Sequence, residues 1–283
     1  MMKKLLLILS VFLAVSCVYT EREDISALGR MGGDGKAVVT LDIQSLKESG
    51  ASALLPQNEI LERLDRISLE LSPSSDEYPL PVSHWDFSGT ANGLLSSTEV
   101  GTLLIWNPDF TRARGDGPKH YVNRNLGLSA GVPEDGVVLF TSGDYLDAYS
   151  SFFRAPMSMS ADIYSAMTGA LAAVYIEKPV TLPYLGFDIP KETIAKIDSL
   201  VLLLGDGDDC FRLYGTVVMD SEDSARTLCT LLRNLLVQEV RRSGERLDVR
   251  ALSGIFTYEG SVLTISGYEL SYDNVGAMLT KEN

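Results

Sequence analysis

The string "GVVLFTSGDYL" (Gly136–Leu146) returns later in the chain as "GSVLTISGYEL" (Gly260–Leu270), with six of the eleven positions identical. Each string is a short apolar run between glycines, a pattern typical of β-strands. Strands that recur at long spacing are a sign of a repeated structural unit. The echo therefore raises the hypothesis that one fold is built twice along this chain.

Further segments match in the same order in the two halves, which makes chance a weak explanation of the echo. All of them read as strands because they are short, apolar and rich in β-branched or aromatic residues. The matched pairs are "AVVTLD" (37–42) with "AAVYIE" (172–177), "ISLEL" (67–71) with "SLVLLL" (199–204), "FSGTAN" with "LYGTVV", which share Gly-Thr at 89–90 and 215–216, and "VGTLLIW" (100–106) with "LSGIFTY".

We therefore predict an α+β protein of two tandem β-α-β-β-(α)-β-β-α repeats, with sheets covered by helices on one face. Repeat 1 spans 36–154 and repeat 2 spans 155–283, as two sheets or as one continuous domain. In repeat 1 we expect a helix over about 57–66. A short helix closes repeat 2, in "SYDNVGAMLTK".

The two predicted repeats differ in two places. The amphipathic pattern over 221–242 predicts a long helix that shrinks to a few residues near 94–100 in repeat 1. The tight hairpin turn at Glu259–Gly260 expands into an insertion at 107–135 in repeat 1.

The N-terminus has the features of an export signal. Two lysines precede an apolar run, Leu5–Val15, which is too short for an ordinary spanning helix. The run ends in "LAVSC", with Ser16 directly before Cys17. This string resembles the lipobox of bacterial lipoproteins, in a looser spirochaetal form because Ala14 stands where leucine is usual.

The resemblance implies a signal peptide at 1–16, palmitate or a similar acyl chain on Cys17, and a lipidated tether at 17–35. Several acyl chains hold a protein on a membrane firmly, at about 0.8 kcal/mol per buried CH₂. The location implied is the cell envelope, at the periplasmic face or the cell surface, with inner or outer membrane left open. The alternative is a plain secretory signal with an incidental cysteine.

Composition excludes some partners and favours a folded body. The net charge of −14 argues against nucleic acid as a partner. A hydrophobic content of 45% is typical of a globular chain. Outside the cytoplasm, Cys210 and Cys229 are free to form a disulfide, and the alternative is two buried thiols.

Few residues are arranged for catalysis. The only histidines are His84 and His120, and neither lies in a recognisable nucleophile motif. The acidic "GDGDD" (205–209) reads as a solvated turn, because a calcium loop needs more ligands. We therefore expect a non-enzymatic protein without metal or cofactor. An acidic-site hydrolase stays open as a minor hypothesis because 38 acids are present.

A segment rich in aromatic residues and methionine, 145–171, bridges the predicted repeats. One interpretation is a pair of amphipathic helices that cover the sheet, and the other is a movable lid or a surface that contacts membrane. The candidates for contact with ligand or membrane are Tyr145, Tyr149, Phe152, Phe153, Met157, Met159 and Met167.

The insertion at 107–135 holds a cluster of positive charge and the tripeptide Arg-Gly-Asp, which adhesion ligands use and which is also ordinary turn chemistry. A protein partner is therefore a second hypothesis for this loop. The candidates for interaction are Arg112, Arg114, Gly115, Asp116, Lys119 and Arg124.

The assembly also resembles treponemal outer-membrane lipoproteins, which join an acylated N-terminus to an α/β body and bind or perturb lipid. The resemblance rests on the first 17 residues and on overall organisation, so it carries over no site residues. We expect a lipid-anchored protein that binds an apolar ligand, such as lipid, or touches membrane through amphipathic helices. The alternative is an adhesion protein that acts through 107–135.

Overall fold

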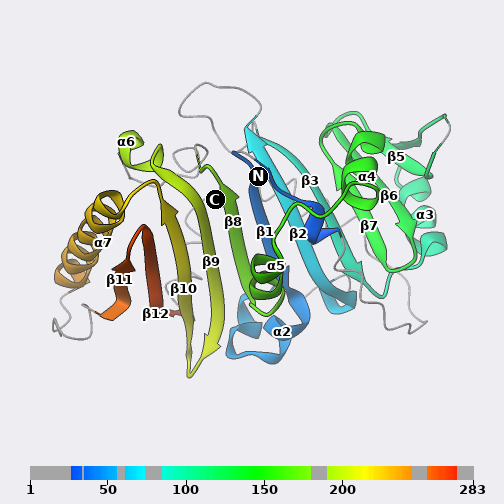
Figure 1. Cartoon of the computed structure of the whole chain (residues 1–283). Helices are drawn as coiled ribbons and strands as arrows, with labels where there is room; N and C mark the ends of the chain where they lie inside the picture. Colours follow the sequence, from blue (N-terminus) through cyan, green and yellow to red (C-terminus); the bar gives the residue numbers. More distant parts are fainter. Residues whose placement is uncertain are drawn as a thin grey trace.

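Two strands that the sequence matches to one another, β1 (Ala37–Asp42) and β8 (Ala172–Glu177), lie side by side at the centre of the protein (Figure 1). They pair antiparallel, with Val39 directly opposite Val174. This pairing joins the two halves into one continuous sheet rather than two. The structure is a computed structural model that describes residues 27–33, 35–55, 61–73, 85–115, 117–179, 190–243 and 254–272.

The sheet has twelve strands, and every pairing along it is antiparallel. From the centre outward, one half runs β1-β2-β3-β7-β6-β5-β4 and the other runs β8-β9-β10-β12-β11. The bounds are β2 (Leu64–Pro73), β3 (Trp85–Gly93), β4 (Phe110–Arg112), β5 (His120–Asn123), β6 (Leu128–Glu134), β7 (Val137–Thr141), β9 (Ile197–Gly207), β10 (Cys210–Met219), β11 (Phe256–Glu259) and β12 (Val262–Ser271).

The described part of the chain adds six α-helices to this sheet, so the fold is of mixed α and β type. The α-helices are α2 (Ile43–Glu48), α3 (Ser97–Trp106), α4 (Tyr145–Phe153), α5 (Ala161–Thr168), α6 (Lys191–Ile194) and α7 (Glu222–Ser243). Three short 3-10 helices accompany them, η1 (Leu28–Arg30), η2 (Gly50–Leu54) and η3 (Leu61–Arg63).

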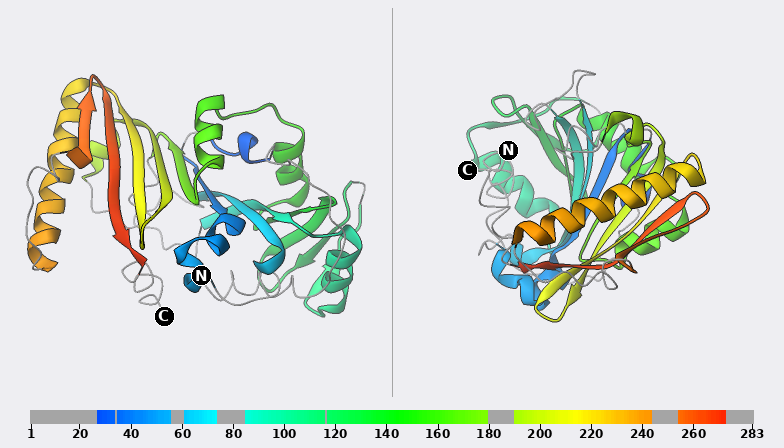
Figure 2. Two further views of the ribbon diagram at one scale, coloured as in Figure 1. Left: turned by 90° about the horizontal axis from the view of Figure 1, so that it is seen from below. Right: turned by 90° about the vertical axis from the view of Figure 1, so that its left-hand side faces the viewer.

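Helices cover both faces of the sheet, not one face as predicted (Figure 2). On β1, Ala37 packs in the cluster that includes α7, whereas its neighbour Val38 packs in the cluster that includes α4 and α5. On β7, Phe140 packs with α3 while Leu139 packs with α4. Central strands such as "VVLFT" are apolar at successive positions, so both of their sides need a cover.

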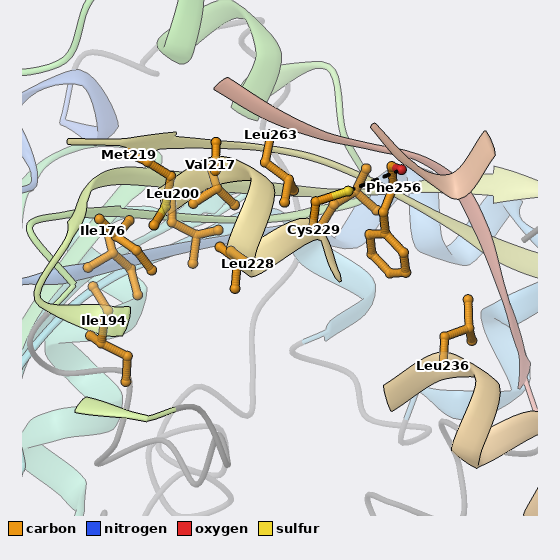
Figure 3. Packing of buried hydrophobic residues seen from close by; sticks show 14 residues of the cluster. Ile176, Ile194, Leu200, Val217, Met219, Leu228, Cys229, Leu236, Phe256 and Leu263 are labelled. Atoms are coloured by element: carbon orange, nitrogen blue, oxygen red, sulfur yellow. Dashed lines mark hydrogen bonds between the residues drawn. The ribbon is translucent and has the colours of Figure 1, made fainter. Parts of the chain in front are cut away.

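Helix α7 closes the second half with an apolar stripe against β10 and β12 (Figure 3). Leu228, Cys229 and Leu236 come from the helix, and Val217 and Leu263 come from the strands below it. All five side chains are buried. Glu222 and Asp223 lie in the first turn, where carboxylates stabilise a helix through its dipole.

The segment 100–106, predicted as a strand, lies within helix α3. The prediction was wrong because a short apolar run does not distinguish a strand from a buried helix. Ser96 and Glu99 form a capping box at its start, and Val100 and Leu104 are spaced for one buried helical face. The helical part of this region therefore extends beyond the few residues predicted near 94–100.

The predicted insertion at 107–135 is largely regular structure rather than a loop, because it contains β4, β5 and β6. The tight turn that joins β6 to β7 consists of Asp135 and Gly136, since Glu134 pairs with Val137. The matching turn in the second half is Gly260–Ser261, one residue later than predicted, since Glu259 pairs with Val262. The extra strands in the first half thus come before the hairpin and do not expand its turn.

The sequence echo is one residue out of step with the strand register. Aligning the two strings places Phe140 against Thr264. In the sheet, however, Phe140 lies opposite Gly89, and Ile265 lies opposite Gly215. Since a shift of one residue turns a strand's side chains to the other face, Phe140 corresponds structurally to Ile265 and not to Thr264.

Two other predicted helices have different outcomes. Of the helix expected over about 57–66, the described part is the single 3-10 turn η3, after which β2 begins at Leu64. Most of the closing helix predicted after β12 lies outside the described residues, as do Cys17, the signal peptide and most of the tether. Cys210 and Cys229 are free thiols, and Cys229 donates a hydrogen bond to the carbonyl oxygen of Phe256 at 3.4 Å.

Candidate functional site

Helix α3 is held at its start by side-chain contacts. The Ser96 hydroxyl accepts a hydrogen bond from the Glu99 N–H, and the Glu99 carboxylate accepts one from the Ser96 N–H, each at 3.3 Å. The N–H of Ser97 donates to the Asp135 carboxylate in the β6–β7 turn at 3.0 Å. These bonds satisfy helix-end donors and fix α3 against the sheet.

The C-terminal end of α3 presents two large apolar side chains to solvent. Val100 and Leu104 face the core and are buried. Each further residue rotates by about 100° around the helix, so the next two positions turn away from the sheet. Ile105 is 61% exposed and Trp106 is 82% exposed. Trp106 is the last residue of the helix, and the sheet does not cover it.

A two-stranded ribbon, β4–β5, continues from this helix end. The Phe110 N–H donates to the Asn107 carbonyl at 3.0 Å, which closes the turn from α3 into β4. Phe110 is buried and anchors the ribbon, with Asn123 opposite it. Arg112 lies opposite Tyr121, whose ring belongs to the core cluster under α3. Paired residues project to the same side of a sheet, so Arg112 lies on the same face as α3.

The predicted interaction residues lie in or beside this ribbon. Arg114 and Lys119 lie in the β4–β5 connection, and Arg124 begins the turn after β5. Asp116 is outside the described residues, so the Arg-Gly-Asp string is described only in part. Each of the other five residues is exposed, namely Arg112, Arg114, Gly115, Lys119 and Arg124.

The aromatic and methionine candidates of 145–171 mostly fill the core. Four are buried in the cluster under α4 and α5, namely Tyr145, Phe152, Met159 and Met167. Tyr149 and Phe153 are half-buried and stack with ring centroids 5.4 Å apart. Met157, in the α4–α5 connection, is 49% exposed and packs on Gly29, where an added Cβ would meet its methyl group.

Helices α4 and α5 are tied to the segment around η1. The Arg30 Nε donates to the Ala155 carbonyl at 2.7 Å, and the Ser158 hydroxyl donates to the Met31 carbonyl at 2.7 Å. Tyr145 at the start of α4 stacks on His120 with ring centroids 4.4 Å apart. Burial raises the pKa of the Tyr145 phenol, which keeps this group neutral. The contacts support the interpretation of 145–171 as a covering pair of helices.

The half-buried carboxylates of the sheet serve as structural links. Asp42 binds Arg66 at 2.6 Å, and the same guanidinium donates to the Thr168 carbonyl at 2.8 Å. Glu70 binds Lys36 at 2.7 Å and accepts the Gly32 N–H at 2.7 Å. Among the described residues, no group of three His, Cys, Asp or Glu side chains is placed to hold a metal ion. His84 is outside the described residues, and His120 contacts the Pro118 carbonyl at 3.1 Å.

Sequence reasoning missed Ile105 and Trp106, because the segment was read as a strand. The signal that would have found them is the capping pattern Ser-x-x-Glu at 96–99 followed by apolar residues at helical spacing. On a helix that buries Val100 and Leu104, the following two residues are expected to face outward. Within the described ranges, no helix has the length and apolar character to cross a membrane.

Comparisons with known proteins find a likeness in structure only. No protein-family model and no curated protein sequence matches the chain. Crystal form IV of TP0453, a treponemal lipoprotein, matches with a TM-score of 0.58 and 10% identity, over 90% of this chain and 96% of that one. Crystal forms III and I of TP0453 match at TM-scores of 0.56 and 0.55, also at 10% identity, over 89% and 91% of this chain and 96% and 97% of theirs. At this identity the likeness shows a shared fold.

Proposed function

We propose that this chain is a non-enzymatic lipoprotein of the bacterial cell envelope whose folded body contacts membrane lipid through the end of α3. The observation that carries the proposal is the exposure of Trp106, at 82%, beside Ile105, at 61%. Tryptophan is favoured at membrane–water interfaces because its ring is apolar and its N–H stays hydrated. An exposed tryptophan and isoleucine side by side at a helix end are suited to shallow insertion among the lipid headgroups of a membrane.

The proposed membrane attachment is acylation of Cys17 after removal of residues 1–16. It rests on the "LAVSC" string, and the shared fold with the lipoprotein TP0453 is consistent with it. With the chain already held at the bilayer, even a weak contact at α3 would be populated, because tethering raises the effective concentration of the contacting surface. The proposed role of the body is contact with lipid rather than catalysis.

Contact at the surface is favoured over a ligand enclosed under α4 and α5. Tyr145, Phe152 and Met167 are the candidates for lining such a site, and each packs within the covering cluster. Each is exposed by no more than 2%. Among the described residues, the two most exposed large hydrophobic side chains are Trp106 and Ile105 of α3, on the opposite face of the sheet, whereas Met157 and Leu146 on the α4–α5 side are 49% and 40% exposed.

We also propose that the two halves are tandem repeats at 36–154 and 155–283. The shared outward strand order, β1-β2-β3-β7-β6 and β8-β9-β10-β12-β11, supports this. The central pairing adds support, because the matched residues Val39 and Val174 lie opposite one another, as they would about a two-fold axis.

The test of lipid contact uses the mature chain from residue 17 with Cys17→Ser, so that neither signal peptide nor acyl chain contributes. The chain has two tryptophans, and Trp85 is only 5% exposed, so Trp106 dominates any change of emission caused by lipid. We expect sedimentation with phosphatidylcholine vesicles and a blue shift of tryptophan emission. Trp106→Ala should lower vesicle binding at least about tenfold, because the interfacial anchor is lost.

A matched control is Leu235→Ala on α7, where the leucine is 40% exposed at the far end of the sheet. This variant should bind vesicles like the parent. Equal sedimentation of the parent and Trp106→Ala, with no emission shift in either, would contradict the proposal.

The second candidate, adhesion through 107–135, is favoured by the exposure of Arg112, Arg114 and Gly115 on the β4–β5 ribbon. It predicts a protein partner whose binding is lost when the β4–β5 connection is replaced. Such a partner would have to bind without lipid, which separates this candidate from membrane contact.

A further inference from the structure

The basic residues of the β4–β5 ribbon lie beside the exposed end of α3. Phe110 opens β4 directly after the turn from Trp106, and Phe110 lies opposite Asn123. Arg124 follows Asn123, so it lies at the end of the ribbon where α3 joins β4. Arg112 lies further along β4 on the face that α3 covers. An apolar tip and a cationic ribbon thus share one end of the sheet.

The charge of this end is opposite to that of the whole protein. The stretch 105–127 contains Arg112, Arg114, Lys119 and Arg124 against the carboxylates of Asp109 and Asp116, whereas the chain carries a net charge of −14. The described ion pairs engage Lys36, Arg66, Arg212 and Arg226, and none of them involves Arg112, Arg114 or Arg124. These guanidinium groups are exposed in the part of the chain that the structure describes.

An acidic body with a basic tip is oriented by a negatively charged surface. The body is repelled and the tip attracted, so approach favours the orientation in which the tip leads. Trp106 then meets the headgroup layer at the point where the arginines meet phosphate. Arginine suits this contact because its guanidinium donates several hydrogen bonds in a plane to phosphate oxygens.

We propose that the β4–β5 ribbon selects bilayers rich in anionic headgroups, with Arg112, Arg114 and Arg124 binding headgroup phosphates while Trp106 inserts beside them. The inference rests on the proposed lipid contact and names the class of lipid. The two contributions differ in kind, because insertion of an indole is insensitive to salt whereas attraction of arginine to an anionic surface is screened by it.

The experiment compares vesicles of phosphatidylcholine with vesicles of phosphatidylcholine and phosphatidylglycerol, again with the mature chain carrying Cys17→Ser. The parent should bind the anionic vesicles at least about tenfold more tightly, since each basic residue near such a surface contributes roughly fivefold. Raising the salt concentration should remove most of this difference. The triple variant Arg112→Gln, Arg114→Gln and Arg124→Gln should lose the preference and keep its binding to neutral vesicles.

The matched control removes the same charge elsewhere, with Lys191→Gln, Lys196→Gln and Arg241→Gln. These residues are exposed on and after α6 and on α7, at the other end of the sheet (Figure 1). The control should keep the preference for anionic vesicles, and circular dichroism should show that both triple variants are folded.

Four outcomes would overturn the inference. Equal binding of the parent to both vesicle types would overturn the selectivity and leave the proposed lipid contact standing. A preference that survives in the arginine variant would show that the ribbon is not responsible. A preference that is lost equally in the control would show that overall charge is responsible instead. Binding to neither vesicle would contradict the proposed function itself, and the inference with it.

Discussion

Helices α3 and α7 cover the same face of the sheet in the two halves, yet they end differently. Helix α7 runs for 22 residues across β10 and β12, whereas α3 runs for 10 residues and stops at an exposed tryptophan. The strand order differs too, because the first half adds β5 and β4 beyond β6, whereas the second half ends at β11. The comparison teaches that one scaffold can close its core with a long helix at one end and present an apolar, basic surface at the other.

The inner faces of the two helices should be equally important for stability. Leu104 of α3 and Leu228 of α7 are 0% and 2% exposed. Replacing either with alanine should lower the free energy of unfolding by about 2–5 kcal/mol, because a cavity is left in a packed core. Urea denaturation of each variant measures this.

The control for that pair is Leu235→Ala, which should change the free energy of unfolding by no more than about 0.5 kcal/mol because the side chain is partly solvated. A cost at Leu104 as small as at Leu235 would mean that α3 is a loosely held appendage. In that case α3 and α7 would not contribute equally to the stability of the protein.

The glycines of β3 and β10 test whether the halves share a packing detail. A Cβ on Gly89 would lie 2.5 Å from the Ser68 carbonyl oxygen, and one on Gly215 would lie 2.7 Å from Leu202 Cδ2 and 2.9 Å from the Val201 carbonyl oxygen. Alanine at either position should destabilise the protein by about 1–3 kcal/mol through overpacking. Gly89→Ala should cost more, because its nearest contact is backbone and cannot rotate away.

Thermal unfolding of the two glycine variants gives the comparison, with Gly254→Ala as the control because no atom lies within 4 Å of an added Cβ there. If neither variant differs from the control in thermal stability, the close approach of the neighbouring strand does not require glycine at position 89 or at position 215.

The smallest expected effect concerns Tyr272, the residue after β12. Its hydroxyl donates to the Asp206 carboxylate at 2.9 Å, and burial together with that carboxylate raises the pKa of the phenol from 10.0 to about 12. Tyr272→Phe should lower the free energy of unfolding by less than about 1 kcal/mol at neutral pH.

The pH dependence of that contribution has a definite sign. Below pH 10 the phenol is protonated in both folded and unfolded chains, so the contribution is fully present. Between pH 10 and about 12 the unfolded chain ionises first, so the contribution falls as pH rises. The urea midpoints of the parent and the variant should therefore differ at pH 8 and become more similar as the pH rises above 10. A difference between the midpoints that does not change with pH would contradict the raised pKa of Tyr272.

Much of the sheet was predictable from local pattern. The strands around Val39, Leu69, Val174 and Leu202 are apolar runs bounded by polar or turn residues, and each of these segments, predicted as a strand, is a strand of the sheet. The region 97–112 was not predictable in the same way, because "VGTLLIW" has the composition of a strand and the capping of a helix. The capping pattern favours the helix, and the burial of Val100 and Leu104 against the sheet agrees with it.

The residues of the candidate site also divide into those whose exposure was predictable from the sequence and those whose exposure was not. Arg112 and Arg124 were singled out by charge alone, and their exposure follows from charge because an unpaired guanidinium is costly to bury. Phe152 and Met167 were singled out as apolar residues, but apolarity is equally the property of a core residue, and the structure buries them. Trp106 was overlooked because its segment was interpreted as a strand, although the capping pattern at 96–99 predicts a helix that turns it outward.

The sequence by itself determined the positions of the central strands and the acidic character of the chain, because these depend on local composition and spacing, and it predicts an export signal on the same grounds. Tertiary structure decided that the halves share one sheet, that helices cover both faces, and that the echo strings are offset by one residue. Each of these depends on pairing between segments far apart in the chain, which local pattern does not encode. Tertiary structure also decided the exposure of Trp106, because this side chain faces solvent when Val100 and Leu104 of the same helix face the sheet.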